Sequence, residues 1–333
     1  MTEATLKSYL TTLPAAGDFL TVTGHPAPDT DAVISALFEA WRLTLSGTPA
    51  VPAVWGALPR ETAWLLGDLA SLIPCIDTPP EGRSVLTDHH DEGGYLGGVA
   101  AVVDHHPLAQ GEALSCPDAE ITSLGATTTM ICLRMQAQGL TPDAVCARIL
   151  LGAILLDTEG LSPYKAKPED LLVARWLVSF CGIDPNSLFT ALRGELLSED
   201  NVTALYRRDY RRYSDRQAAP LLGFAILKVW ADACPDLDAV RQLLAADDTP
   251  NRVAKIVLNN RDNHGRSEYY LAAGEGAKSL LEQVQKGGGD GAIFVAEDCL
   301  FLPESCPHPG RKTMAPLLLE KILKKSEKTT KKP

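Results

Sequence analysis

The sequence lacks the segments that would attach a protein to a membrane or direct it to secretion. No apolar stretch approaches the ~20 residues of a membrane helix, and the longest, Ile149–Leu156, is followed at once by Asp157. The N-terminal residues contain no basic stretch followed by an apolar run, so a signal peptide is not indicated. The eight cysteines include no CxxC pair, which favours reduced thiols over a zinc site or a disulfide framework. We therefore expect a cytoplasmic protein with no membrane partner.

Positive charge is also in short supply. The chain has 31 Lys and Arg against 42 Asp and Glu, a formal net charge of −11. Most of such a surface repels nucleic acid, so we expect no nucleic-acid partner. A polyanionic substrate is compatible with this charge if metal ions and a few local cations neutralise it.

The length of 333 residues is about right for two domains. In the first half, short apolar runs alternate with segments of helical periodicity, which predicts an α/β fold with a parallel sheet. Ligands of such sheets bind at the carboxyl ends of the strands. The expected strands are 19–23, 51–55, 84–87 and 99–103, and the expected helices are 31–45, 61–72, 124–138 (capped by Thr122 or Ser123) and 143–156.

The second half has a different pattern. Residues after Asp157 look helical to about Tyr213, with Pro168 and Pro185 as start signals. Five strands then alternate with helices, which predicts a smaller mixed-sheet domain, joined to the first within 191–201. The strands are 222–230, 253–258, 269–273, 291–296 and 300–302, and the helices are 237–246, 277–285 and 315–324. We expect domains at 1–192 and 193–325, followed by a basic flexible tail at 326–333.

Four polar clusters each follow an apolar run in the first domain. They are GHPAPDTDA with His25, Asp29 and Asp31, TDHHDE with Asp88, His89 and His90, VVDHHP with Asp104, His105 and His106, and LLDTEG with Asp157. Any one alone could be a helix cap or a surface turn. Five of the seven histidines fall in the first three clusters. Together they predict a metal site, and His and Asp donors without thiolates suit Mn²⁺, Co²⁺, Fe²⁺ or Zn²⁺.

The order of these clusters resembles the DHH phosphoesterase superfamily, and most closely its manganese-dependent (family II) inorganic pyrophosphatases. That family has a GHxxPDTDS element, Asp-His-Asn and Asp-His-His strand ends and a later LxDT. The C-terminal stretch GRKTMAPLLLEKI is similar to the basic element of the DHHA2 domain. The resemblance covers nearly the whole chain. It implies a parallel-sheet DHH domain and a mixed-sheet α/β DHHA2 domain, with the active site in the cleft between them.

Carried over residue by residue, the resemblance implies two metal ions that share Asp88. One ion would be bound by His25, Asp29 and Asp88, and the other by Asp31, Asp88, His105 and Asp157. Asp104 and His89 would orient the ligands, and His106 would face the substrate as a catalytic residue beside Asp88. The phosphates would be held by Arg211, Arg311 and Lys312 of the second domain.

The activity implied is that of a manganese-dependent inorganic pyrophosphatase, which hydrolyses pyrophosphate to two phosphates. Two ions lower the pKa of a shared water, so that a metal-bridging hydroxide forms at neutral pH and attacks phosphorus in line. The expected cofactors are two Mn²⁺ or Co²⁺ per chain, with additional Mg²⁺ accompanying the substrate. The resemblance leaves a homodimer open.

Several residues depart from the pyrophosphatase pattern. His90 stands where the family has Asn, Pro107 where it commonly has Arg, and the run after Asp157 is altered. These departures keep a short-chain exopolyphosphatase, or another phosphoanhydride hydrolase, as an alternative. A second alternative is a non-catalytic binding protein similar to the prune-type proteins. A nuclease of the DHHA1 branch is disfavoured because the Gly287–Asp290 run lacks that branch's His.

Overall fold

The chain divides into two compact units, Met1–Glu195 and Leu196–Pro333. The sequence predicts this boundary between residues 192 and 193. The structure is a computed structural model that describes residues 1–14, 17–108, 113–198, 201–214, 220–260, 265–288, 291–307, 314–315 and 319. The predicted cations Arg311 and Lys312, most of the predicted 315–324 helix and the predicted tail at 326–333 lie outside these residues.

The first unit is built on a six-stranded parallel sheet with the strand order β3-β2-β1-β4-β5-β6. From β1 the chain adds strands in one direction and from β4 in the other, so the order reverses between these two strands. At such a reversal the connections leave in opposite directions and open a crevice for a ligand. The strands are β1 (Leu20–Thr23), β2 (Ala50–Trp55), β3 (Cys75–Ile76), β4 (Ser84–Thr87), β5 (Val99–Asp104) and β6 (Ala119–Ile121).

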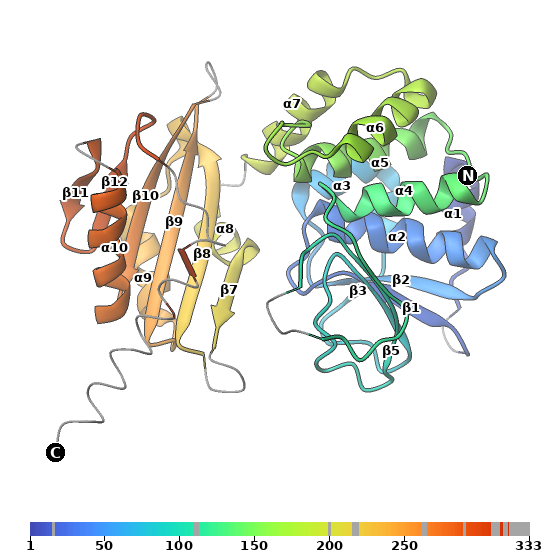
Figure 1. Ribbon diagram of the computed structural model, residues 1–333, viewed down its shortest axis with the longest axis horizontal. Coiled ribbons are helices and arrows are strands. Elements are labelled where there is room, and N and C mark those ends of the chain that lie inside the picture. Colours follow the sequence, from blue (N-terminus) through green and yellow to red (C-terminus); the bar gives the residue numbers. More distant parts are fainter. Residues whose placement is uncertain are drawn as a thin grey trace. The chain divides into compact units, whose positions relative to one another are not determined.

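Helices of the first unit lie over one side of the sheet (Figure 1). Their apolar faces form one large core, in which the central helix α5 is buried along nearly its whole length. No helix of the described residues is long and apolar enough to cross a membrane. The helices are α1 (Glu3–Thr11), α2 (Thr30–Leu45), α3 (Arg60–Leu66), the 3₁₀ helix η1 (Gly67–Leu72), α4 (Thr127–Ala137), α5 (Ala144–Asp157), α6 (Pro168–Cys181) and α7 (Pro185–Leu196).

The second unit contains a mixed six-stranded sheet with the order β11-β12-β10-β9-β8-β7, in which β8 and β9 are the only parallel pair among the described strands. Separate apolar cores lie on its two faces. Both sheets confirm the predicted fold class. The elements are α8 (Val202–Arg208), β7 (Tyr210–Tyr213), β8 (Leu222–Trp230), η2 (Ala231–Ala233), α9 (Leu237–Ala246), β9 (Asn251–Asn259), β10 (Arg266–Ala273), α10 (Glu275–Gly288), β11 (Ile293–Ala296) and β12 (Cys299–Leu302).

Some local predictions were wrong. The predicted 61–72 helix is interrupted at Gly67, whose φ of 58° ends α3 before the 3₁₀ helix η1. The predicted helical stretch ends early, since Tyr210–Tyr213 forms the edge strand β7 by pairing with β8. Helix α1 and the short strands β3 and β6 had not been predicted. These strands have two and three residues, too few for an alternating pattern to stand out.

Candidate metal centre

The first cluster occupies the turn between β1 and α2. Gly24 follows the strand, and a Cβ there would lie 2.6 Å from the Cβ of Ala32, so only glycine lets the turn approach the helix this closely. Asp29 is the N-cap of α2, and its Oδ1 accepts a hydrogen bond from the Ala32 N–H at 3.1 Å. The other carboxylate oxygen, Oδ2, lies 4.0 Å from His25 Nε2. Asp29 can therefore cap the helix with one oxygen and bind a metal ion with the other.

Asp31 is buried in the first turn of α2 and is held by the start of another helix. Its two oxygens accept hydrogen bonds from the backbone N–H groups of Thr127 and Thr128, at 2.6 and 2.9 Å. These groups are among the first N–H groups of α4, which have no partner within their own helix. The predicted cap of this helix at Thr122 or Ser123 was wrong, because α4 begins at Thr127 after an extended Ala126.

Asp88 lies between the clusters. It follows β4 in the left-handed conformation, with φ 61°, which Asp adopts more readily than most residues. Its Oδ2 lies 3.6 Å from His25 Nε2, and its Oδ1 lies 3.4 Å from His105 Nε2. The Thr127 hydroxyl donates to Oδ1 at 3.1 Å. The two oxygens of Asp88 thus face two different groups of donors, as a bridging carboxylate would.

His105 and Asp157 complete the second group. His105 Nε2 lies 3.3 Å from Asp157 Oδ2, and its other nitrogen, Nδ1, lies 3.0 Å from the Leu124 carbonyl. A bond from Nδ1–H to this carbonyl leaves the Nε2 lone pair directed at the carboxylates. Asp157 is the last residue of α5, where the negative end of the helix dipole disfavours a carboxylate that has no cation beside it.

Asp104 and His106 lie at the edge of this arrangement. Asp104, the last residue of β5, is fully buried, and its Oδ1 accepts hydrogen bonds from His106 Nδ1 at 2.9 Å and His106 N at 3.0 Å. Its Oδ2 is 2.5 Å from His90 Nδ1. The bond to Nδ1 leaves Nε2 of His106 unbound to Asp104. The His106 side chain is 33% exposed, and Nδ1 lies 3.7 Å from Asp88 Oδ1.

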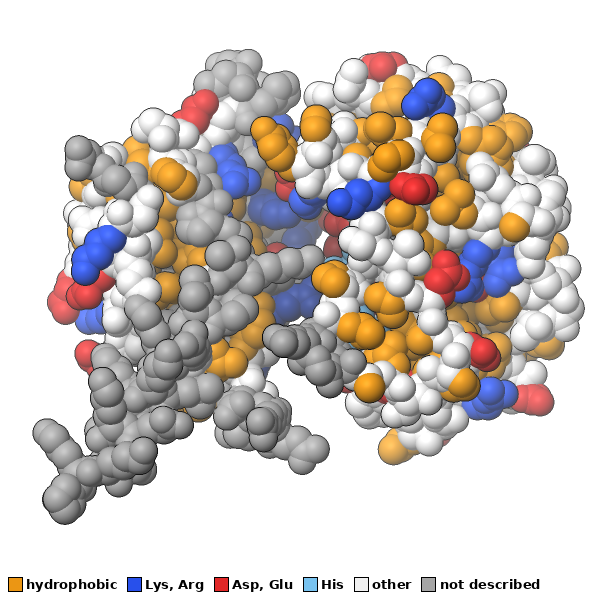
Figure 2. Space-filling model, viewed as in Figure 1, with side chains coloured by type: hydrophobic (Ala, Val, Ile, Leu, Met, Phe, Trp, Pro, Cys, Tyr) orange, Lys and Arg blue, Asp and Glu red, His pale blue; other side chains and the backbone are white. Residues whose placement is uncertain are grey.

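The donor set fits divalent metal ions. Donor atoms of His25, Asp29 and Asp88 lie within 4.8 Å of one another, as do those of Asp31, His105 and Asp157. Neighbouring ligands of one ion bound at about 2.1 Å are roughly 3 to 3.4 Å apart, close to the 3.3–3.6 Å measured around His105 and Asp88. Figure 2 shows little histidine surface (pale blue) on the face in view, and the side chains of His25, His90 and His105 are mostly buried.

The electrostatics of the cluster also call for cations. Burial raises the pKa of Asp31, and burial together with the charges of Asp31 and Asp29 raises that of Asp88 well above its ordinary value. Burial and then repulsion by Asp31 raise the pKa of Asp157 to about 6. Burial alone would lower the pKa of His105, but bonding to Asp88 and the nearby carboxylates raise it to about 10. Without an ion, the cluster therefore takes up protons to offset its negative charge.

Asp104 behaves differently from these carboxyl groups. Burial by itself would raise its pKa, but hydrogen bonds from His106 and His90 outweigh burial and lower the pKa to about 2. Asp104 therefore stays ionised and available to orient His106. His89 bonds to Thr87 O at 3.1 Å and Tyr95 OH at 3.0 Å, and no bond from it to a predicted ligand occurs in the described residues. His89 lies beside the proposed ligands through a contact between rings, because its ring stands edge-on to that of His25.

Two residues outside the predicted set of site residues shape the site. Thr127 contacts Asp31 and Asp88, and its hydroxyl also accepts a bond from His105 N at 3.3 Å. Asp170 of α6 is fully buried and accepts bonds from Gly125 N at 2.8 Å and the Thr129 hydroxyl at 2.6 Å. It thereby fixes the turn that carries Thr127. The turn that carries Thr127 has the sequence SLGAT at 123–127, which resembles the small-residue turn of the pyrophosphatases, but nothing in the sequence pairs this turn with Asp170.

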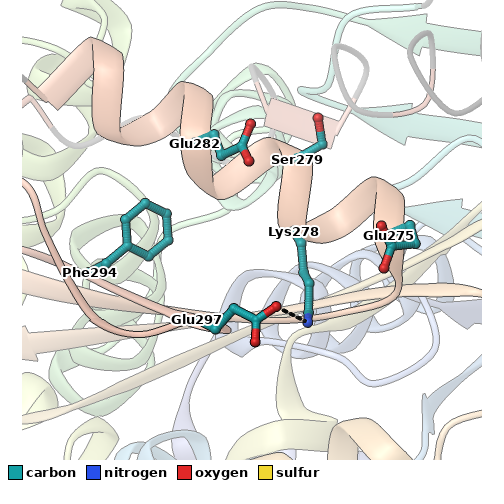
Figure 3. Close-up of a pocket in the computed structure, with 6 residues that line it drawn as sticks. All are labelled: Glu275, Lys278, Ser279, Glu282, Phe294 and Glu297. Atoms are coloured by element: carbon teal, nitrogen blue, oxygen red, sulfur yellow. Dashed lines mark hydrogen bonds and ion pairs between the residues drawn. The ribbon is translucent and has the colours of Figure 1, made fainter.

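In the second unit, the predicted cation Arg211 lies on β7, is exposed and has Nε 3.8 Å from Asp209 Oδ1. This unit also has a pocket of about 460 Å³, shown in Figure 3. It is lined by Glu275, Lys278, Ser279, Glu282, Phe294 and Glu297. The pocket contains none of the predicted site residues, and its three carboxylates are unsuited to a polyanion.

Known proteins show similarity in sequence and in fold. No family model matches the chain. It is 30% identical over 203 residues to a Deinococcus radiodurans protein named probable manganese-dependent inorganic pyrophosphatase, covering 58% of this chain and 64% of that protein. It is 26% identical over 175 residues to the manganese-dependent inorganic pyrophosphatase of Methanothrix thermoacetophila, covering 50% of this chain and 56% of that protein. These sequence matches span less than two thirds of the relatives' own length.

A crystal structure of a candidate family II inorganic pyrophosphatase from Methanococcus jannaschii shares the fold. Its TM-score is 0.66 at 19% identity, and the match covers 91% of this chain and 99% of that chain. At 19% identity this structural match supports the fold alone. The chain is thus similar in sequence to manganese-dependent inorganic pyrophosphatases, and it shares its α/β fold with a candidate family II enzyme.

Proposed function

We propose that the chain is a manganese-dependent inorganic pyrophosphatase that hydrolyses pyrophosphate to two phosphates. One observation carries the proposal: the two oxygens of Asp88 face two separate His and Asp groups, with the ring of His106 beside them. His25, Asp29 and Asp88 would hold one divalent ion, and Asp31, Asp88, His105 and Asp157 the other. Bound there, the ions would activate a water and neutralise charge on the phosphoryl oxygens.

The contacts of the residues around these groups support a hydrolytic role. Asp104 accepts the Nδ1 proton of His106, which fixes that tautomer and leaves Nε2 for the substrate. An Nε2 so placed can exchange a proton with an oxygen of the reacting phosphoryl group. Thr127 and the start of α4 hold Asp31 and Asp88 in place, so the carboxylates need no rearrangement as charge develops.

Charge balance indicates that further cations take part. Four carboxylates of the proposed ligand set carry a formal charge of −4, which two divalent ions only cancel. Pyrophosphate brings three or four more negative charges, and Arg offers it planar, two-point hydrogen bonding. We assign this role to Arg211, Arg311 and Lys312 of the second unit. The name of the relatives, the donor set and this charge balance support pyrophosphate as the substrate.

The test is phosphate release from pyrophosphate, tripolyphosphate, long-chain polyphosphate and ATP by protein loaded with Mn²⁺, Co²⁺ or Mg²⁺. We expect the highest kcat/KM with pyrophosphate and Mn²⁺, and loss of turnover in Asp88→Asn. Asp91→Asn is the matched control, because Asp91 is three residues away and bonds only to Gly93 N among the described groups. Preference for tripolyphosphate or longer chains would replace the proposal by an exopolyphosphatase. No turnover of any phosphoanhydride would leave a binding protein.

A further inference from the structure

His90 is a residue to which the family resemblance gives no role. It follows Asp88 by two positions, on the loop after β4, and stands where the pyrophosphatase pattern has Asn. In the structure its ring turns toward the end of the neighbouring strand β5. His90 Nδ1 lies 2.5 Å from Asp104 Oδ2, and the His90 side chain is only 15% exposed. The ring is thus held in the protein and not displayed to solvent.

Asp104 connects His90 to the proposed substrate-facing histidine. Its Oδ1 accepts both the ring and the backbone N–H of His106, and its Oδ2 accepts from His90. The donors therefore come from two loops, one after β4 and one after β5. The terminal torsion of an Asp side chain normally rotates over a broad range. When both carboxylate oxygens accept hydrogen bonds, this rotation would break at least one of the bonds.

Removal of the His90 ring would leave Oδ2 of a fully buried carboxylate without this donor. Among the described residues, no other hydrogen bond to Oδ2 replaces it. The unsatisfied oxygen would then compete for the N–H groups of His106, because an unpaired buried charge is costly. His106 would lose its fixed orientation while the ligands on Asp88 and His105 kept their own contacts.

We propose that His90 is a positioning residue that fixes the ring of His106 through Asp104. The inference rests on the proposed function for its consequence, since His106 is the group that would face the reacting phosphate. An Asn at this position places its side-chain N–H₂ at the position of ring Nδ1, so Asn and His can make the same bond to Asp104. His90 would then replace the family's Asn in donating this bond.

The kinetic test uses His90→Ala, His90→Asn, His106→Ala and the double variant His90→Ala/His106→Ala, each loaded with Mn²⁺. We expect His90→Ala to lower kcat for pyrophosphate about tenfold or more, with KM and Mn²⁺ content little changed. His90→Asn should restore most of kcat. In the His106→Ala background, His90→Ala should have almost no further effect on kcat, because the ring through which His90 would act is already absent. Equal losses in the two backgrounds would overturn the proposal.

A second readout does not depend on turnover. In metal-free protein labelled with ¹⁵N-histidine, the His106 Nδ1 proton should be protected from solvent exchange by its bond to Asp104. We expect His90→Ala to abolish this protection, and both His90→Asn and the control Asp91→Asn to keep it. Protection that persists in His90→Ala would refute the positioning role. If the wild-type protein fails to hydrolyse pyrophosphate but the protection responds as expected, the proposed function fails and the positioning role stands.

Discussion

We expect Asp157→Asn to have opposite effects on the thermal stability of the metal-free and the metal-loaded protein. Burial and repulsion by Asp31 raise the pKa of Asp157 from its ordinary 3.8 to about 6, even with the attraction of His105 included. At about 1.4 kcal/mol for each tenfold change in proton affinity, the ionised side chain destabilises the metal-free fold by roughly 3 kcal/mol. Asn has nearly the same shape and no charge, so the substitution removes this destabilisation.

The pH dependence follows from the direction of the shift. A carboxyl group whose pKa is raised by folding binds its proton more tightly in the folded chain. Stability is therefore fully present below the unfolded pKa of 3.8 and is lost as pH rises through about 6. Metal-free Asp157→Asn should melt roughly 5–10 °C above the wild type at pH 7.5, for a unit of this size. Near pH 4 the two proteins should melt at almost the same temperature.

The assay is thermal unfolding followed by circular dichroism, in chelator and in saturating Mn²⁺. Mn²⁺ should raise the melting temperature of the wild type far more than that of the variant, because a ligand is missing. Asp143→Asn at the other end of α5 is a matched control of opposite sign. Asp143 accepts bonds from Cys146 N and Glu3 N through its two different oxygens, and its pKa is lowered. Asn keeps one acceptor oxygen and caps a helix as well as Asp does, but its N–H₂ group cannot accept the second bond, so Asn should cost about 1 kcal/mol. Metal-free Asp157→Asn that melts below the wild type at pH 7.5 would refute the reasoning.

Four further substitutions and one deletion test the site. Asp88→Asn should reduce bound Mn²⁺ from about two ions per chain by elemental analysis and lower turnover by orders of magnitude; full metal content would exclude the bridging role. Gly125→Ala should lower the melting temperature by several degrees, because a Cβ there would lie 2.5 Å from Asp170 Oδ2; an unchanged melting curve would contradict this. Arg311→Ala and Lys312→Ala should each raise KM for pyrophosphate with metal content unchanged, whereas deletion of the tail after Ser326 should not. Normal kinetics in both would place the phosphate contacts elsewhere.

The sequence by itself determined the kinds of side chain available for the site and the strands that carry them. The strands β4 (Ser84–Thr87) and β8 (Leu222–Trp230) and the helix α9 (Leu237–Ala246) have the predicted bounds. Apolar periodicity is a local property of the chain, so it can be read without knowing what packs against it. Because parallel strands place their carboxyl ends at one edge, it also predicted that the polar clusters would meet there.

Only the tertiary structure decided which partner each polar group takes. Helix α4 begins at Thr127 because Asp31, 96 residues earlier, accepts its first N–H groups. Tyr210–Tyr213 is a strand because β8 pairs with it, although its local pattern had suggested a helix. His90 acquires a partner only because β4 and β5 are neighbours in the sheet. Hydrogen bonds between distant residues leave no periodic trace in the sequence, so these contacts had to be seen in the folded chain.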